Sequence, residues 1–135
     1  MIGHVISGRL VRTFALGLPL FFLAGCAAEM RCGDSDSLSL AEEIIEENLE
    51  KAVWYREISD QITGSTVRGA TTLTRNAELR SSTCRATYAF EYRGKSHESE
   101  FEYEIHFLED EDDFELSLDI DTVKSKVMAA ALFER

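Results

Sequence analysis

Strict alternation of apolar and polar side chains in the second half of the chain constrains the fold more than any other feature. Between residues 100 and 107, aromatic and aliphatic residues alternate with glutamates and one histidine. A period of two is typical of a β-strand with one buried and one wet face. Two further segments share this period of two, so three half-buried strands are predicted. Their apolar positions are Cys84, Ala86, Tyr88, Phe90 and Tyr92 in the first; Phe101, Tyr103, Ile105 and Phe107 in the second; and Phe114, Leu116, Leu118 and Ile120 in the third.

The segments between these strands are short. Residues 93–96 and 109–113 have the length of hairpin connections, so sequential antiparallel strands are the simplest arrangement. A fourth, weaker strand is predicted within residues 63–75. One face of such a sheet is apolar and must be covered by another element.

An amphipathic helix is predicted ahead of the strands. Ser39 and Glu42 have the spacing of a capping box, so the helix is expected to begin there, and its end is placed between Ala52 and Asp60. Residues 53–55 can extend it or begin a strand. Its apolar stripe, with steps of three and four, contains Leu38, Ala41, Ile45, Leu49 and Ala52, flanked by Ile44 and Val53. Residues 122–135 are a candidate for a second, short helix.

The predicted fold class is α+β, with an N-terminal amphipathic helix packed on a three- or four-stranded antiparallel meander. Residues 38–135 form its single domain.

The first 26 residues have a different character. Arg9 and Arg12 precede an apolar run, residues 14–23, which is too short for the roughly 20 residues of a membrane-spanning helix. Small residues and a cysteine follow, in the order Leu23-Ala24-Gly25-Cys26. This tetrapeptide resembles the lipobox of bacterial lipoproteins. The alternatives are an ordinary signal peptide and a buried helix that ends in Gly-Cys.

The lipobox resemblance implies a route to the membrane. Residues 1–25 would be a lipoprotein signal peptide, and Cys26 would become the lipidated, palmitate-bearing N-terminus of a tether spanning residues 26–37. The expected location is the cell envelope, with the N-terminal lipid in the membrane. Because Ala27 and not aspartate follows the cysteine, the resemblance implies the outer membrane, facing the periplasm, in a Gram-negative cell.

Three cysteines in an exported chain would leave one unpaired. With Cys26 lipidated, Cys32 and Cys84 remain, and outside the cytoplasm they are expected to form a disulfide. The alternative of a redox or metal-binding pair is weak, because the two are far apart in sequence and there is no Cys-x-x-Cys motif.

The chain is strongly acidic. Its formal charge is −11, and all 25 acidic residues but only 12 of the 14 basic residues follow Gly25, which leaves −13 for residues 26–135. Such a surface repels nucleic acid and favours a basic protein partner, although solubility alone also accounts for the charge.

A weak candidate binding surface is the polar side of the second predicted strand. Arg85 and Arg93 are expected to form cross-strand ion pairs with glutamates of this surface. Its residues are Glu100, Glu102, Glu104 and His106.

No pattern for catalysis or for a cofactor is present. The acidic run 109–113 lacks the glycine and spacing of an EF-hand, so we interpret it as a solvated hairpin tip and not as a calcium site. His97 and His106 are the histidines that follow residue 25, and His106, on the polar face among glutamates, is expected to be a surface imidazole. No metal site is predicted, and Trp54 and Tyr55 are expected at the edge of the core.

A helix followed by a meander that curls around it is similar to cystatin-like and NTF2-like domains of small lipoproteins. The similarity is architectural and carries no functional residue, since no cystatin Gln-x-Val-x-Gly loop is present. The favoured hypothesis is a non-enzymatic, membrane-anchored envelope lipoprotein with a small acidic binding or structural domain. The alternatives are a small-ligand-binding or enzymatic NTF2-like domain, which a polar cavity of several hundred Å³ lined by titratable groups would favour, and an inhibitor of a basic protein such as lysozyme.

Overall fold

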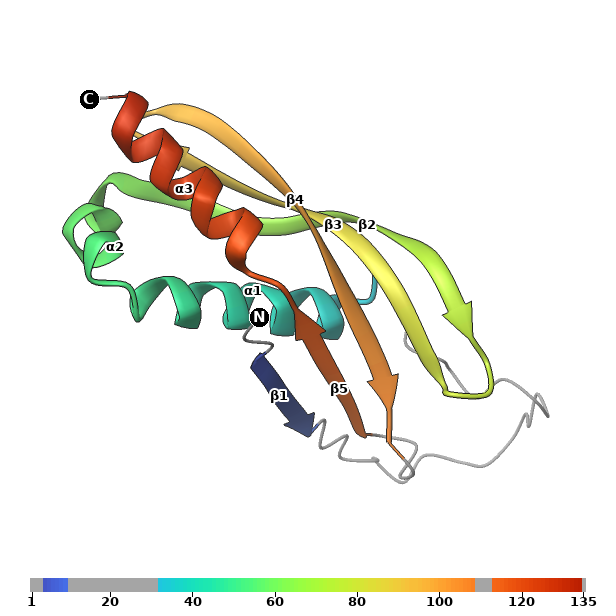
Figure 1. Cartoon of the computed structure of the whole chain (residues 1–135). Coiled ribbons are helices and arrows are strands. Elements are labelled where there is room, and N and C mark those ends of the chain that lie inside the picture. The colour runs from blue at the N-terminus through green and yellow to red at the C-terminus, as the bar shows by residue number, and fades with distance from the viewer. Residues whose placement is uncertain (1–3, 10–31, 109–112, 135) are drawn as a thin grey trace, which may run out of the picture.

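The computed structural model describes residues 4–9, 32–108 and 113–134 of the chain (Figure 1). The predicted lipobox, with Cys26, and most of the predicted tether lie outside these ranges, as do residues 109–112 of the acidic run. The described elements are β1 (His4–Arg9), α1 (Ser35–Glu50), α2 (Val53–Ile58), a 3₁₀ turn (Ser59–Gln61), β2 (Ile62–Asn76), β3 (Ser81–Tyr92), β4 (Lys95–Phe107), β5 (Asp113–Leu118) and α3 (Asp121–Phe133).

The predicted α+β fold class is confirmed. Strands β2, β3, β4 and β5 form an antiparallel meander, and the sheet order is β1-β5-β4-β3-β2. Strand β1, which the sequence analysis did not predict, pairs antiparallel with β5 in the register His4–Leu118 to Arg9–Asp113. Long, curved strands extend past α1, and α3 lies beside them (Figure 1).

The alternation of side chains places the core where it was predicted. Every predicted apolar position of β3 is buried, as are Phe101, Tyr103 and Ile105 of β4 and Phe114, Leu116 and Leu118 of β5. Phe107 is only partly buried, at the end of β4. Helices α1 and α3 contribute to the same core cluster, so both cover one face of the sheet.

Helix α1 differs from its prediction at both ends. It begins at Ser35, four residues before the expected capping box, and Ser39 does not cap it. Instead, the Ser37 hydroxyl shares its one hydrogen between the carbonyls of Asp34 (2.9 Å) and Cys32 (3.1 Å), in the turn that leads into the helix. The helix ends at Glu50, before the expected range, and residues 53–58 form the separate short helix α2.

The buried side of α1 also includes more than the predicted stripe. Leu40 and Ile44 are buried with Ala41, Ile45 and Leu49. Val53, expected at the flank of the stripe, is 68 % exposed because the chain changes direction after Glu50. The candidate C-terminal helix is present as α3, where Val123, Val127 and Ala130 are buried and Leu132 is exposed.

Candidate functional site

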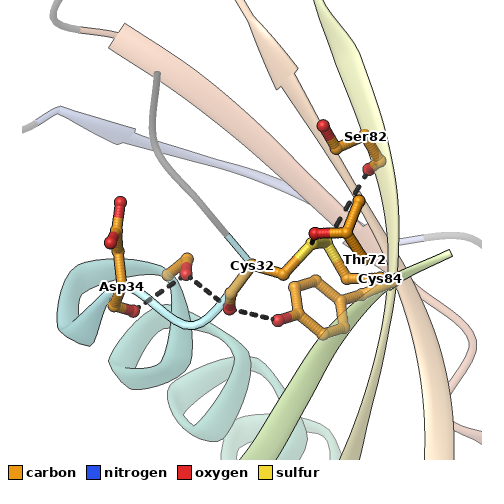
Figure 2. Close-up of a disulfide and its surroundings, with 7 residues drawn as sticks. Cys32, Asp34, Thr72, Ser82 and Cys84 are labelled. Carbon is orange, nitrogen blue, oxygen red and sulfur yellow. Dashed lines mark hydrogen bonds between the residues drawn. A yellow bond between two sulfur atoms is a disulfide. The ribbon is translucent and has the colours of Figure 1, made fainter. Parts of the chain in front are cut away.

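A disulfide joins Cys32, in the turn before α1, to Cys84 on β3, as the cysteine count predicts. The Cα atoms are 5.7 Å apart, and both residues are buried. Figure 2 shows the bond between the start of α1 and the sheet, with the Thr72 hydroxyl 3.2 Å from the Cys32 sulfur. The Cys32 carbonyl also accepts a 2.6 Å hydrogen bond from the Tyr103 hydroxyl. Buried sulfurs in this setting indicate a structural bond and not a reactive site.

The weak candidate surface on β4 is exposed, and only part of its expected pairing forms. Arg85 lies 3.0 Å from Glu102 in the predicted cross-strand ion pair, and Arg68 of β2 pairs with Glu98. Arg93 was expected to pair with a glutamate of β4, and this is wrong. Its side chain donates to Gln61 Oε1 and to the backbone carbonyl of Glu134, because the hairpin turn directs it toward those elements.

The two histidines after residue 25 lie in different settings. His106 is exposed on β4, opposite Glu115 of β5. His97 is partly buried: its ring stacks on Phe90 with centroids 5.2 Å apart, and Nε2 lies 3.0 Å from Glu134 Oε2. The expectation of a surface imidazole is confirmed for His106, whereas His97 joins the end of α3 to β4.

An open pocket lies where α1, α2 and β2 meet, and no local sequence pattern indicates it. Its volume is about 540 Å³, within the range of about 300–1,000 Å³ usual for ligand pockets. The change of direction after Glu50 brings α2 over one end of the pocket. The register shift between Thr63 and Thr66, where Gly64 has a φ of +65°, forms the bulge that carries Ser65 on the other side. The lining residues are Glu46, Glu50, Tyr55, Arg56, Ser59, Ile62 and Ser65.

Burial and like charges shape the electrostatics of this pocket. Burial raises the pKa of the Glu46 carboxyl, and the neighbouring Glu42 and Glu50 raise it further. The pKa of Tyr55 is raised by burial, and then by Glu46 and Glu50. The pocket therefore has a surplus of negative charge that a bound cation would relieve.

Tyr88 of β3 stands close to the pocket lining. Burial raises its pKa to about 12, and Tyr55, Glu46 and Glu42 add to this rise. The Ser65 hydroxyl acts in the opposite direction and lowers the pKa. The Tyr88 hydroxyl is buried and has no hydrogen-bond partner.

The outer side of α1 extends the negative surface. A shallow groove of about 320 Å³ follows this side and shares Glu46 and Glu50 with the pocket; its lining is Ser39, Glu42, Glu43, Glu46, Glu47 and Glu50. The Glu42 carboxylate is also held in place, since it accepts a 3.2 Å hydrogen bond from the backbone N–H of Val67 in β2. The glutamates and the fourth strand were both predicted from the sequence, but the contact between them was not.

A metal-binding cluster and a membrane-spanning helix are both absent from the described parts of the chain. Residues 32–108 and 113–134 contain no group of three or more histidine, cysteine or acidic side chains placed to hold a metal ion. No helix within the described ranges has both the length and the apolar character needed to cross a membrane.

The fold and site define an acidic α+β domain in which a curved antiparallel meander packs against one long helix and carries a polar pocket at its margin. No protein family, curated protein or solved structure matches this chain.

Proposed function

We propose that this chain is a lipid-anchored protein of the cell envelope whose acidic domain binds a basic partner and performs no catalysis. The single observation that carries the proposal is the disulfide that follows the lipobox-like sequence by six residues, Cys26 to Cys32. Stable disulfides form outside the reducing cytoplasm, which agrees with export through the N-terminal segment. The formal charge of −13 after Gly25 supports encounter with a basic partner.

The same spacing would keep the start of α1 close to a membrane. Six residues span at most about 20 Å, so Cys32 would remain near the lipid surface. The 16 residues of α1 extend about 24 Å from that end, and the pocket lies at the far end of the helix. The pocket would therefore lie about one helix length from the anchored end of the domain. Cleavage before Cys26 would also remove β1 and leave β5 as an edge of the sheet.

Lipid attachment can be tested by substituting Cys26. Wild-type cells grown with radiolabelled palmitate should yield a labelled, membrane-bound protein that resists a salt wash, because two or three acyl chains anchor far more firmly than one. Cys26→Ser should abolish labelling and leave an uncleaved or soluble precursor. Cys84→Ser is the matched control and should remain labelled. Palmitate on the Cys26→Ser protein would contradict the proposal.

The pocket favours the small-ligand-binding alternative as a second candidate. It has the size and the titratable lining that this alternative requires, although it is open at the margin of helix and sheet and the space between them is filled by the apolar core. Its lining contains no histidine, since His97 and His106 lie on β4. Titration with small cationic and neutral compounds, followed by calorimetry, tests this candidate separately from lipid attachment.

Inhibition of a basic enzyme such as lysozyme is a special case of the basic-partner proposal. A lysozyme activity assay with added protein tests this case.

A further inference from the structure

We propose that the pocket between α1, α2 and β2 is a binding site for a primary alkylammonium group, supplied by a free amine or by a lysine side chain of a basic protein. The proposal rests on the binding role proposed above and gives it a place and a ligand class. It does not depend on lipid attachment.

The lining offers what an alkylammonium group requires. Glu46 is partly buried and Glu50 lies one turn further along α1, so two carboxylates can accept charge-assisted hydrogen bonds from the three N–H donors. Ser59 and Ser65 add hydroxyl acceptors on the opposite side. The ring of Tyr55 and the side chain of Ile62 supply apolar surface for the methylene stem.

The buried hydroxyl of Tyr88 is a second and independent indication of a ligand. Tyr88 is 1 % exposed, and an orphaned buried hydroxyl is uncommon because it has lost water without gaining a partner. Tyr88 is not itself part of the lining, but Ser65, whose hydroxyl acts on it, is. A donor bound to the Ser65 oxygen would leave the Ser65 hydrogen free to bond with the Tyr88 hydroxyl.

The charge of the pocket selects a cation over an anion. Arg56 is the one cationic side chain in the lining, against the carboxylates of Glu46 and Glu50. Arg56 is exposed on the short helix α2, so its guanidinium can remain in solvent when a ligand enters. The glutamates on the outer side of α1 add negative potential at the mouth. An anion would meet this potential without a compensating charge deep in the pocket.

Calorimetric titration of the purified, disulfide-bonded full-length protein tests the site. The probes are cadaverine and N-acetyl-lysine methylamide, with 1,5-pentanediol as the neutral control, all at matched ionic strength. Both amines should bind and the diol should not. Glu46→Gln should weaken amine binding about tenfold or more, whereas the matched variant Glu43→Gln, on the same helix but outside the pocket, should change it less than about twofold. Tyr88→Phe should weaken binding at least about threefold without reducing stability.

A measurement on the unaltered protein keeps the test independent of folding defects. Amine titration followed by NMR should shift the backbone amides of Tyr55 and Ser65 more than those of Ser39 and Glu43. Stronger binding of cadaverine than of the lysine derivative would indicate a free amine, and the reverse a lysine side chain. Equal losses in Glu46→Gln and Glu43→Gln, unchanged binding in Tyr88→Phe, or no binding of either amine would overturn the proposal. The palmitate experiment is unaffected by any of these results.

Discussion

The Tyr103 hydroxyl donates a 2.6 Å hydrogen bond to the backbone carbonyl of Cys32, 71 residues earlier in the chain. Tyr103 is paired with Cys84 across strands β3 and β4, so this bond lies beside the disulfide and closes a second link between the sheet and the turn before α1. Together with the Ser37 hydroxyl, the Tyr103 hydroxyl satisfies a carbonyl that lies outside the backbone hydrogen bonds of α1.

Removal of this hydroxyl should destabilise the protein. Tyr103→Phe deletes a buried hydrogen bond and should lower the free energy of unfolding by about 1–2 kcal/mol. Tyr88→Phe is the matched control, since Tyr88 is equally buried but its hydroxyl has no partner; it should be neutral or stabilising. Urea unfolding of the three proteins measures the difference. A larger loss in Tyr88→Phe than in Tyr103→Phe would contradict the assignment.

Loss of the disulfide should act first on the start of α1. Cys32→Ser should lower the free energy of unfolding by about 2–4 kcal/mol, because the bond closes a loop with a sequence separation of 52 residues. Hydrogen exchange should accelerate in the first turns of α1 before it does in β3. Membrane anchoring through Cys26 should be unchanged. Two reactive thiols in the folded, lipidated protein would show that the bond does not form.

Alkaline pH should destabilise the fold through its buried tyrosines. Burial raises the pKa of Tyr88 and of Tyr103 to about 12, above the ordinary value of 10.0. The unfolded chain therefore ionises first, and the stabilisation present below pH 10 should be lost as the pH rises from about 10 to 12. Urea midpoints measured across this range, together with tyrosinate absorbance, test the effect. The double variant Tyr88→Phe/Tyr103→Phe should show a smaller pH dependence, and an unchanged slope would refute the assignment.

The contact between His97 of β4 and Glu134 at the end of α3 should contribute more to the free energy of unfolding than the exposed ion pairs do. Glu134→Ala removes the partner of His97, whose side chain is only 14 % exposed, and should cost about 1–2 kcal/mol and loosen the last turn of α3. Glu102→Ala removes the exposed pair with Arg85 and should cost less than about 1 kcal/mol. Thermal unfolding and hydrogen exchange at the end of α3 distinguish the two. Equal costs would mean that burial adds nothing to the His97 contact.

The β3–β4 hairpin should be sensitive to its turn glycine. Arg93 and Gly94 have φ values of 51° and 79° between the paired residues Tyr92 and Lys95, as a type I′ turn requires. Gly94→Ala should cost about 1 kcal/mol, because a Cβ is unfavourable at positive φ even though nothing crowds it. Gly33→Ala is the control, with equally open surroundings and no positive φ. A neutral Gly94→Ala would show that the turn can relax.

Periodicity was enough to predict the sheet and its buried face. Alternation along β3, β4 and β5 assigns each side chain to a face without knowledge of its neighbours, because a strand repeats every two residues. Short connections then made the meander the simplest topology. The pairing of Cys32 with Cys84 followed from counting cysteines, once Cys26 was assigned to lipid. The strands follow from local patterns and the disulfide from the number of cysteines, so the amino-acid sequence alone determined both.

The start of α1, strand β1 and the pocket depended on contacts between distant segments. The disulfide and the hydrogen bonds of Ser37 hold the turn at Cys32, so the helix begins before its capping box. Strand β1 forms by pairing with the edge of β5. The pocket needs α2 to turn back toward a bulge in β2, which brings Glu46 and Ser65 to opposite sides of one space. Neither residue has a local pattern that indicates the other, because only the packing of helix against strand places them together.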